Sequence, residues 1–202
     1  MMRRFAKWTA AAMIAVGLLS GCTSEPPWRT HDIAGLVPEL SFALTDDRGR
    51  SVSAKDYRGR VTLLFFGFTH CPDVCPTTLA RLAETLRSIE AGRDDVRVLV
   101  VTVDPARDST AVMHQYVQAF GSQFVGLRGD AAALDALTRR YRVTYTLGKP
   151  DAQGNYEVTH STAVFVFGRD GLARLMFTPK DTTAAIAEDL RRLILASNHP
   201  KG

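Results

Sequence analysis

The feature that most constrains the fold is a pair of cysteines, Cys71 and Cys75, placed between two strongly patterned segments. Residues 61–68 before the pair are almost entirely apolar, which is typical of a strand covered on both faces. Residues 79–89 after the pair carry Leu and Ile at steps of three and four, which predicts an amphipathic helix. The pair therefore occupies the turn between a buried strand and the helix that follows it.

The rest of the chain alternates strand-like and helical segments. Further strands are predicted over residues 39–44, 50–53, 96–103, 124–127, 162–167 and 172–177, and further helices over residues 109–120, 130–141 and 181–196. This alternation predicts a three-layer α/β/α domain, and a cysteine pair in a strand-to-helix turn predicts its thioredoxin-like form. We expect an N-terminal β-hairpin extension, and an inserted hairpin over residues 144–159 before the strand that follows His160.

The first 38 residues read as an export signal followed by a tether. A charged start precedes an apolar run over residues 8–19, which is too short for a comfortable transmembrane helix. Small residues before Cys22 resemble a bacterial lipoprotein processing site, so we expect a signal peptide over 1–21, lipidation of Cys22 and a tether over 22–38. The alternative is an uncleaved anchor or a plain signal peptide with a free Cys22. The domain, over 39–198, is expected in the bacterial cell envelope, lipid-anchored and on the periplasmic side.

The net charge of +4 belongs mainly to this first segment. The chain has 25 Lys and Arg against 21 Asp and Glu, and three of the basic residues lie within the first seven positions. Without those three the balance is 22 against 21, which leaves +1, and no stripe of Lys and Arg appears elsewhere. The composition therefore gives no support for nucleic-acid binding.

A proline follows each cysteine. Pro76 suits the first position of a helix, and it disfavours a helical backbone at the residue before it. We therefore expect Cys75 at or near the N-cap and Cys71 in the preceding loop. The positive end of the helix dipole should lower the pKa of the thiols and favour thiolate, which both redox exchange and metal binding require.

The sequence alone leaves three possible functions for the cysteine pair. A structural disulfide would close so small a loop that it constrains little of the unfolded chain. Thiol–disulfide exchange without a metal is the second use. A metal site is favoured because His160 precedes a predicted buried strand, and in a thioredoxin-type fold the segment entering this strand lies beside the cysteine loop. Two thiolates and one imidazole suit copper in either oxidation state, and also zinc.

Three ordered motifs, over residues 67–76, 103–108 and 156–161, resemble those of the Sco/SenC family of copper proteins. The resemblance runs from about residue 30 to the final helix. It implies a thioredoxin-like fold and copper, as Cu(I), Cu(II) or both, held by the two cysteines and His160. One position departs from the pattern, because many members have an acidic residue where Thr159 stands.

The same resemblance implies a role in assembling the dinuclear copper centre of cytochrome c oxidase. That role is copper delivery, reduction of the target's cysteines, or both. The implied partners are the copper-bearing oxidase subunit, other copper chaperones or thiol reductants, and a membrane through the lipid anchor. The alternative function is a thiol–disulfide oxidoreductase that acts on partner disulfides without metal transfer. A peroxiredoxin-like peroxidase is disfavoured, because the threonine three residues before its reactive cysteine is missing here.

Four further residues lie close to these motifs in the sequence. Asp104 ends a predicted buried strand at the functional edge, so it is expected either to orient a ligand or to serve as an ordinary turn residue. Asp73 could act near the metal, although a turn former explains it equally well. Tyr156 is expected to pack either beside the site or within its own hairpin. His70 neighbours Cys71, but a side chain next to a ligand on an extended turn usually points elsewhere.

Overall fold

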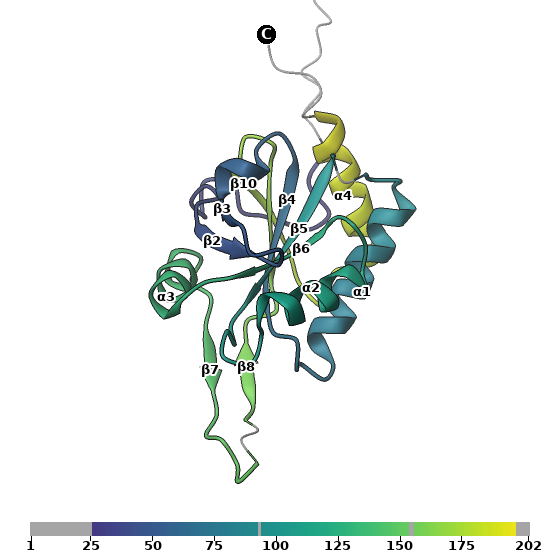
Figure 1. Ribbon diagram of the computed structural model, residues 1–202. Helices are drawn as coiled ribbons and strands as arrows, with labels where there is room; N and C mark the ends of the chain where they lie inside the picture. Colours follow the sequence, from purple (N-terminus) through teal and green to yellow (C-terminus); the bar gives the residue numbers. More distant parts are fainter. Residues whose placement is uncertain (1–25, 93, 154–155, 197–202) are drawn as a thin grey trace, which may run out of the picture.

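A mixed eight-stranded sheet forms the centre of the computed structural model, which describes residues 26–92, 94–153 and 156–196 (Figure 1). The strand order is β1-β10-β9-β4-β5-β6-β2-β3. In chain order these strands are β1 (His31–Asp32), β2 (Ala43–Asp46), β3 (Ser51–Ser53), β4 (Val61–Gly67), β5 (Val96–Thr102), β6 (Phe124–Arg128), β9 (Val164–Phe167) and β10 (Ala173–Phe177). The remaining two, β7 (Tyr145–Leu147) and β8 (Val158–His160), form a separate two-stranded sheet.

The two strands in the middle of the large sheet, β4 and β5, are buried along their whole length. They run parallel, and their register aligns Val61 with Val96 and Gly67 with Thr102. On the other side of β4, β9 runs antiparallel, so β9 begins at the edge where β4 and β5 end. The loops after β4 and β5 and the segment before β9 therefore meet at one edge, which is where open α/β sheets carry functional loops.

Helices cover both faces of the sheet. α1 (Val74–Ser88) and α4 (Thr183–Ala196) lie side by side on one face, and α3 (Ala131–Arg140) lies on the other side (Figure 1). α2 (Thr110–Gln118) follows β5, and a short 3-10 helix (Ala54–Tyr57) follows β3. The predicted three-layer, thioredoxin-like α/β/α domain is confirmed, with β2 and β3 as its hairpin extension and β7 and β8 as its inserted hairpin.

Apolar spacing and capping explain where the helices form. Leu79, Leu82 and Leu86 of α1 are all buried, as their three- and four-residue spacing predicted. Ser109 and Asp130 cap α2 and α3, since each side chain accepts a hydrogen bond from the backbone N–H of the third helical residue. These caps determine where the two helices before and after β6 begin.

Residues 29–33 contact the domain, although the sequence predicted a tether over residues 22–38. β1 pairs with β10 at one edge of the sheet. Asp189 of α4 is buried, and it accepts hydrogen bonds from the backbone N–H groups of Arg29 and Thr30 and from the Thr30 hydroxyl. These polar contacts join distant parts of the chain and produce no hydrophobic periodicity, so the sequence pattern could not predict them.

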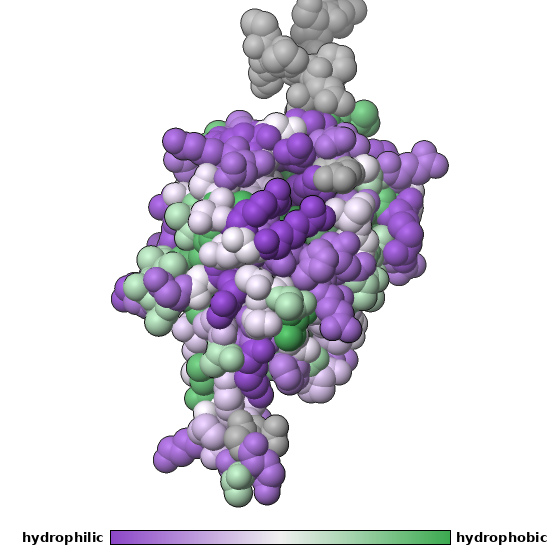
Figure 2. Space-filling model, viewed as in Figure 1, coloured by the Kyte–Doolittle hydropathy of each residue, from purple (hydrophilic) through white to green (hydrophobic). Residues whose placement is uncertain are grey.

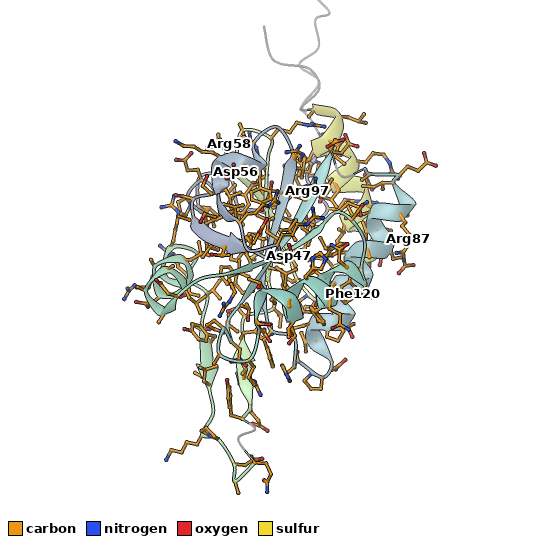
Figure 3. All side chains as sticks on the ribbon, viewed as in Figure 1. Asp47, Asp56, Arg58, Arg87, Arg97 and Phe120 are labelled. Atoms are coloured by element: carbon orange, nitrogen blue, oxygen red, sulfur yellow. The ribbon has the colours of Figure 1, made fainter. Side chains whose placement is uncertain are left out.

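The face of the molecule shown in Figure 2 is mostly hydrophilic. Figure 2 shows apolar side chains only in small separate patches on the visible face. Arg97, near the start of β5, lies toward the end of the sheet away from the β7–β8 hairpin (Figure 3). None of the described helices is both long and apolar enough to cross a bilayer.

Candidate metal centre

The cysteine half of the site is built on the end of β4 and the first turn of α1. Asp73 is the N-cap residue, so Cys75 is the second residue of α1 and Pro76 the third, slightly further into the helix than predicted. A proline is accepted there because the first N–H groups of a helix have no intrahelical partner. The backbone N–H of Cys75 donates to the Sγ of Cys71 over 3.3 Å, so the helix N-terminus faces that sulfur.

The two cysteines differ in exposure. Cys75 is 1% exposed, whereas Cys71 lies in the loop and is only half-buried. Gly67, the last residue of β4, makes room for the buried sulfur. A Cβ atom at this position would lie 2.8 Å from Cε1 of Phe65 and 3.1 Å from Sγ of Cys75. A glycine is therefore required where β4 passes beneath Cys75.

Asp108 fixes the loop that leads to Cys71. Its carboxylate is fully buried and accepts hydrogen bonds from the backbone N–H and the hydroxyl of Thr69, at 3.0 and 2.5 Å. It also accepts a hydrogen bond of 2.6 Å from the hydroxyl of Thr102, at the end of β5. No sequence pattern indicates this role, because the burial of Asp108 and its contact with Thr69 appear only in the folded chain.

The histidine half lies on the β7–β8 hairpin, which projects from the body of the domain (Figure 1). His160 is the last residue of β8, and its Nδ1–H donates to the carbonyl oxygen of Ser161 over 2.8 Å. This hydrogen bond leaves Nε2 as the free imidazole nitrogen, and Nε2 lies 3.2 Å from the Sγ of Cys75. The rings of Phe65 and Phe68 meet the imidazole edge-on, each with centroids 5.8 Å away, so the ring is held in an apolar pocket.

The structure brings the three predicted ligands together. One ligand atom from each of Cys71, Cys75 and His160 lies within 4.8 Å of the others, and within the described residues no other cluster of this kind was found. Both cysteines are free thiols. Two sulfurs and one imidazole nitrogen form a donor set that suits copper or zinc and is unsuited to magnesium or calcium.

Burial shifts the pKa values of Cys75 and His160. It raises the pKa of the Cys75 thiol, which corrects the lowered pKa that the helix dipole led us to expect for this cysteine. The reason is that the sulfur is enclosed beneath the loop and so loses the solvation of its charged form. Burial also lowers the pKa of His160, opposed in part by the hydrogen bond to Ser161, so the imidazole stays neutral and free to bind a metal.

The other predicted residues lie outside this triad of ligand atoms. Asp104 is fully buried at the end of β5, and its Oδ1 accepts a hydrogen bond of 2.5 Å from the hydroxyl of Tyr156. Asp73 is exposed, and its Oδ1 accepts a hydrogen bond from the hydroxyl of Thr77, so it is a helix-start residue. His70 is exposed and lies beside Thr69 rather than among the ligands.

The predicted lipidation site, Cys22, and the predicted signal peptide over residues 1–21 lie outside the described residues. Both stay predictions.

Comparison with known proteins places the chain among copper proteins. A family model described as SCO1/SenC matches residues 37–195. The mitochondrial SCO2 homolog of Bos taurus is 41% identical over 162 residues, which cover 79% of this chain and 61% of the bovine protein. The chain thus spans less than two thirds of that relative's length. The SCO1 and SCO2 homologs among the relatives are named as mitochondrial proteins, which overturns the predicted location in the bacterial cell envelope.

Solved structures with copper bound share the fold. Arabidopsis thaliana ScoI with copper bound is 30% identical, with a TM-score of 0.72, and the match covers 79% of this chain and 99% of that one. Bradyrhizobium japonicum ScoI with copper bound is 38% identical, with a TM-score of 0.70, and the match covers 78% and 99% of the two chains.

Proposed function

The chain belongs to the SCO1/SenC family, and from this premise we propose that it binds copper and assists assembly of the dinuclear copper centre of cytochrome c oxidase. The observation that carries the proposal is the convergence of Cys71, Cys75 and His160, whose ligand atoms lie within 4.8 Å of one another. Copper on both similar ScoI structures supports the choice of metal over zinc. The thiolate-rich donor set also suits copper in both oxidation states.

In this proposal the protein supplies two thiolates and one neutral imidazole in a partly closed pocket. The Ser161 carbonyl oxygen accepts a hydrogen bond from Nδ1–H of His160, and this keeps Nε2 directed at the sulfurs. Phe65 and Phe68 pack against the ring and limit its contact with water. Copper held by two thiolates carries one negative charge as Cu(I) and none as Cu(II), so the site accepts either form without a large buried charge.

Reduction of a partner's disulfide is the second candidate function, supported by the two free thiols, whose sulfur atoms lie within 4.8 Å of each other. The thiolate of Cys71, the more exposed cysteine, would attack the partner disulfide, form a mixed disulfide and release one partner thiol. Cys75 would then attack the Sγ of Cys71 and release the second partner thiol, leaving a Cys71–Cys75 disulfide. The partner gains two electrons and two protons, and the pair then needs a thiol reductant.

The partners in this proposal are the copper-bearing subunit of the oxidase and either other copper chaperones or thiol reductants. Attachment to a membrane through the N-terminal segment is part of the proposal. The charged start of the chain and the apolar run over residues 8–19 support it.

Replacing the third ligand separates the two functions. His160→Ala removes an imidazole donor and leaves both thiols, so we expect Cu(I) affinity, measured by competition with a chromophoric chelator, to fall on the order of tenfold or more. Reduction of a small aromatic disulfide by the same variant should stay within about twofold of wild type. His31→Ala, an exposed histidine on β1, is the matched control and should change neither value. Unchanged Cu(I) affinity in His160→Ala would remove His160 from the ligand set.

A further inference from the structure

We propose that Arg107 and Tyr156, braced by Asp104, are positioning residues that hold the β7–β8 hairpin so that His160 faces the two cysteines. The inference rests on the proposed function, because it takes His160 as the third copper ligand. It assigns a role in metal binding to residues that donate no atom to the metal.

The fixed end of the arrangement lies at the edge of the main sheet. Asp104 follows β5 and is fully buried. Its backbone N–H donates to the Thr102 hydroxyl over 2.9 Å, and its Oδ2 accepts a hydrogen bond from Nε of Arg107. The guanidinium is therefore oriented by a carboxylate that cannot move independently of the sheet.

On the β7–β8 hairpin, the contacts with Asp104 and Arg107 are all made by Tyr156. Tyr156 donates its hydroxyl to Oδ1 of Asp104 over 2.5 Å, and its carbonyl oxygen accepts a hydrogen bond of 3.3 Å from Nη1 of Arg107. The guanidinium carbon also lies 3.8 Å from the centroid of the Tyr156 ring. Main-chain, hydroxyl and ring contacts thus hold one residue in a single orientation, four positions before His160.

The hairpin needs such an anchor because its own hydrogen bonds lie within it. β7 and β8 pair only with each other, and the bonds from Gly148 to Glu157 and from Ser161 to Thr144 close the hairpin on itself. Every described residue from 144 to 161 is exposed or only half-buried. Of its strand residues, the partly buried Tyr145 and Val158 pack against the core. A two-stranded ribbon is weakly ordered unless other parts of the fold hold it, so the contacts of Tyr156 add to this limited apolar packing.

Arg107 also contacts the cysteine side of the site. Its guanidinium carbon lies 5.9 Å from the centroid of Phe68, and the Phe68 ring packs edge-on against the imidazole of His160. The same side chain therefore contacts the hairpin and the aromatic residue that borders the third ligand. The route from Asp104 to His160 runs through described contacts at each step.

The test is a double-mutant cycle in Cu(I) affinity. Tyr156→Phe removes one hydroxyl and keeps the ring, and we expect it to weaken Cu(I) binding about three- to tenfold, as loss of one hydrogen bond of ordinary strength predicts. In the His160→Ala background the same substitution should change the affinity by less than about twofold, because its effect requires the imidazole. Tyr145→Phe is the matched control, since this hairpin tyrosine has no hydroxyl partner among the described residues.

A second measurement needs no metal. In the metal-free protein, Tyr156→Phe should speed hydrogen exchange at the amides of Gly148 and Ser161, while the amides of β4 keep wild-type rates. Wild-type affinity and exchange in Tyr156→Phe would overturn the inference, and so would an equal loss of affinity with and without His160. Failure of His160→Ala alone to weaken copper binding would instead overturn the proposed function.

Discussion

The two halves of the metal centre are held by different means. The cysteines stand at the junction of a fully buried strand and a helix whose apolar face lies in the core. His160 stands on a two-stranded hairpin with no buried residue in its described part. The first half is fixed by hydrophobic packing, and the second depends on a few polar and aromatic contacts and on the partly buried Tyr145 and Val158, which pack against the core. The packing of β4 and α1 therefore fixes the positions of the two sulfurs. The distance from the sulfurs to the imidazole depends instead on contacts that single substitutions can remove.

The largest expected effect comes from breaking the packed half. Cys75→Ala should lower Cu(I) affinity on the order of a hundredfold or more, judged from the ~10–16 kcal/mol that zinc-finger peptides gain from four ligands. In the Cu(II) form it should also weaken the sulfur-to-copper charge-transfer band, because Cys71 remains as the one thiolate ligand. Competition titration and absorption spectroscopy measure these two values. A band of wild-type intensity in Cys75→Ala would exclude Cys75 as a ligand, and a loss smaller than that of His160→Ala would reverse the ranking of the two halves.

The next effect concerns the glycine beneath the buried sulfur. Gly67→Ala places a methyl group 2.8 Å from Cε1 of the fully buried Phe65, so the free energy of unfolding should fall by about 1–3 kcal/mol. Urea denaturation with fluorescence detection measures this. Gly148→Ala in the hairpin is the comparison. A Cβ there would lie 3.2 Å from the carbonyl oxygen of Glu157, a tight contact but on an exposed ribbon that can shift, so its cost should be smaller, about 0.5–1 kcal/mol. Equal costs would mean that the two halves are equally well packed.

A smaller effect tests the loop between the two halves. Asp108→Asn keeps the shape of the side chain but replaces one accepting oxygen by a donor, opposite the Thr69 and Thr102 hydroxyls. We expect the free energy of unfolding to fall by about 1–2 kcal/mol, measured by urea denaturation. Asp130→Asn is the control, because Asn caps a helix as well as Asp does. A neutral Asp108→Asn would show that the buried carboxylate does not hold the loop.

The last prediction concerns the pH dependence of copper affinity. It separates the two halves because Cys75 must lose a proton to bind copper, whereas His160 is already neutral. Burial raises the pKa of Cys75, so its thiol is protonated at neutral pH and metal binding must release that proton. Apparent copper affinity should therefore fall about tenfold per pH unit for each proton released as pH decreases. Burial lowers the pKa of His160, so the slope should not steepen near pH 6.5, the ordinary value for histidine. A steeper slope there, measured by competition titration, would show that His160 titrates normally.

The sequence predicted well those parts of the molecule that hydrophobic packing decides. The apolar run over residues 61–68 predicted β4, and the leucine spacing after it predicted α1. Both predictions are possible because a buried strand or helix face leaves a recognisable apolar pattern in the sequence. The predicted thioredoxin-like arrangement also placed the segment with His160 beside the loop of Cys71 and Cys75. The structure places their ligand atoms together there.

The sequence did not predict features that depend on contacts between distant polar side chains. Asp108 and Asp189 are buried carboxylates that hold loop backbone, and neither belongs to a periodic pattern. Asp104 and Tyr156 were both singled out, but their contact with each other through a hydroxyl could not be seen from their spacing. The raised pKa of Cys75 was also missed, because it depends on how deeply the sulfur is enclosed rather than on its place near a helix start.

The unequal exposure of the two cysteines gives ligand exchange at this site a direction. Cys75 is closed off by β4 beneath it, while Cys71 and His160 keep part of their surface open. In the proposed transfer of copper, a donor atom from another protein would approach from the open side and compete first with these two ligands. Cys75 would then be the last ligand to be displaced. Gly67, which leaves room for the buried sulfur, would thereby contribute to the order of exchange.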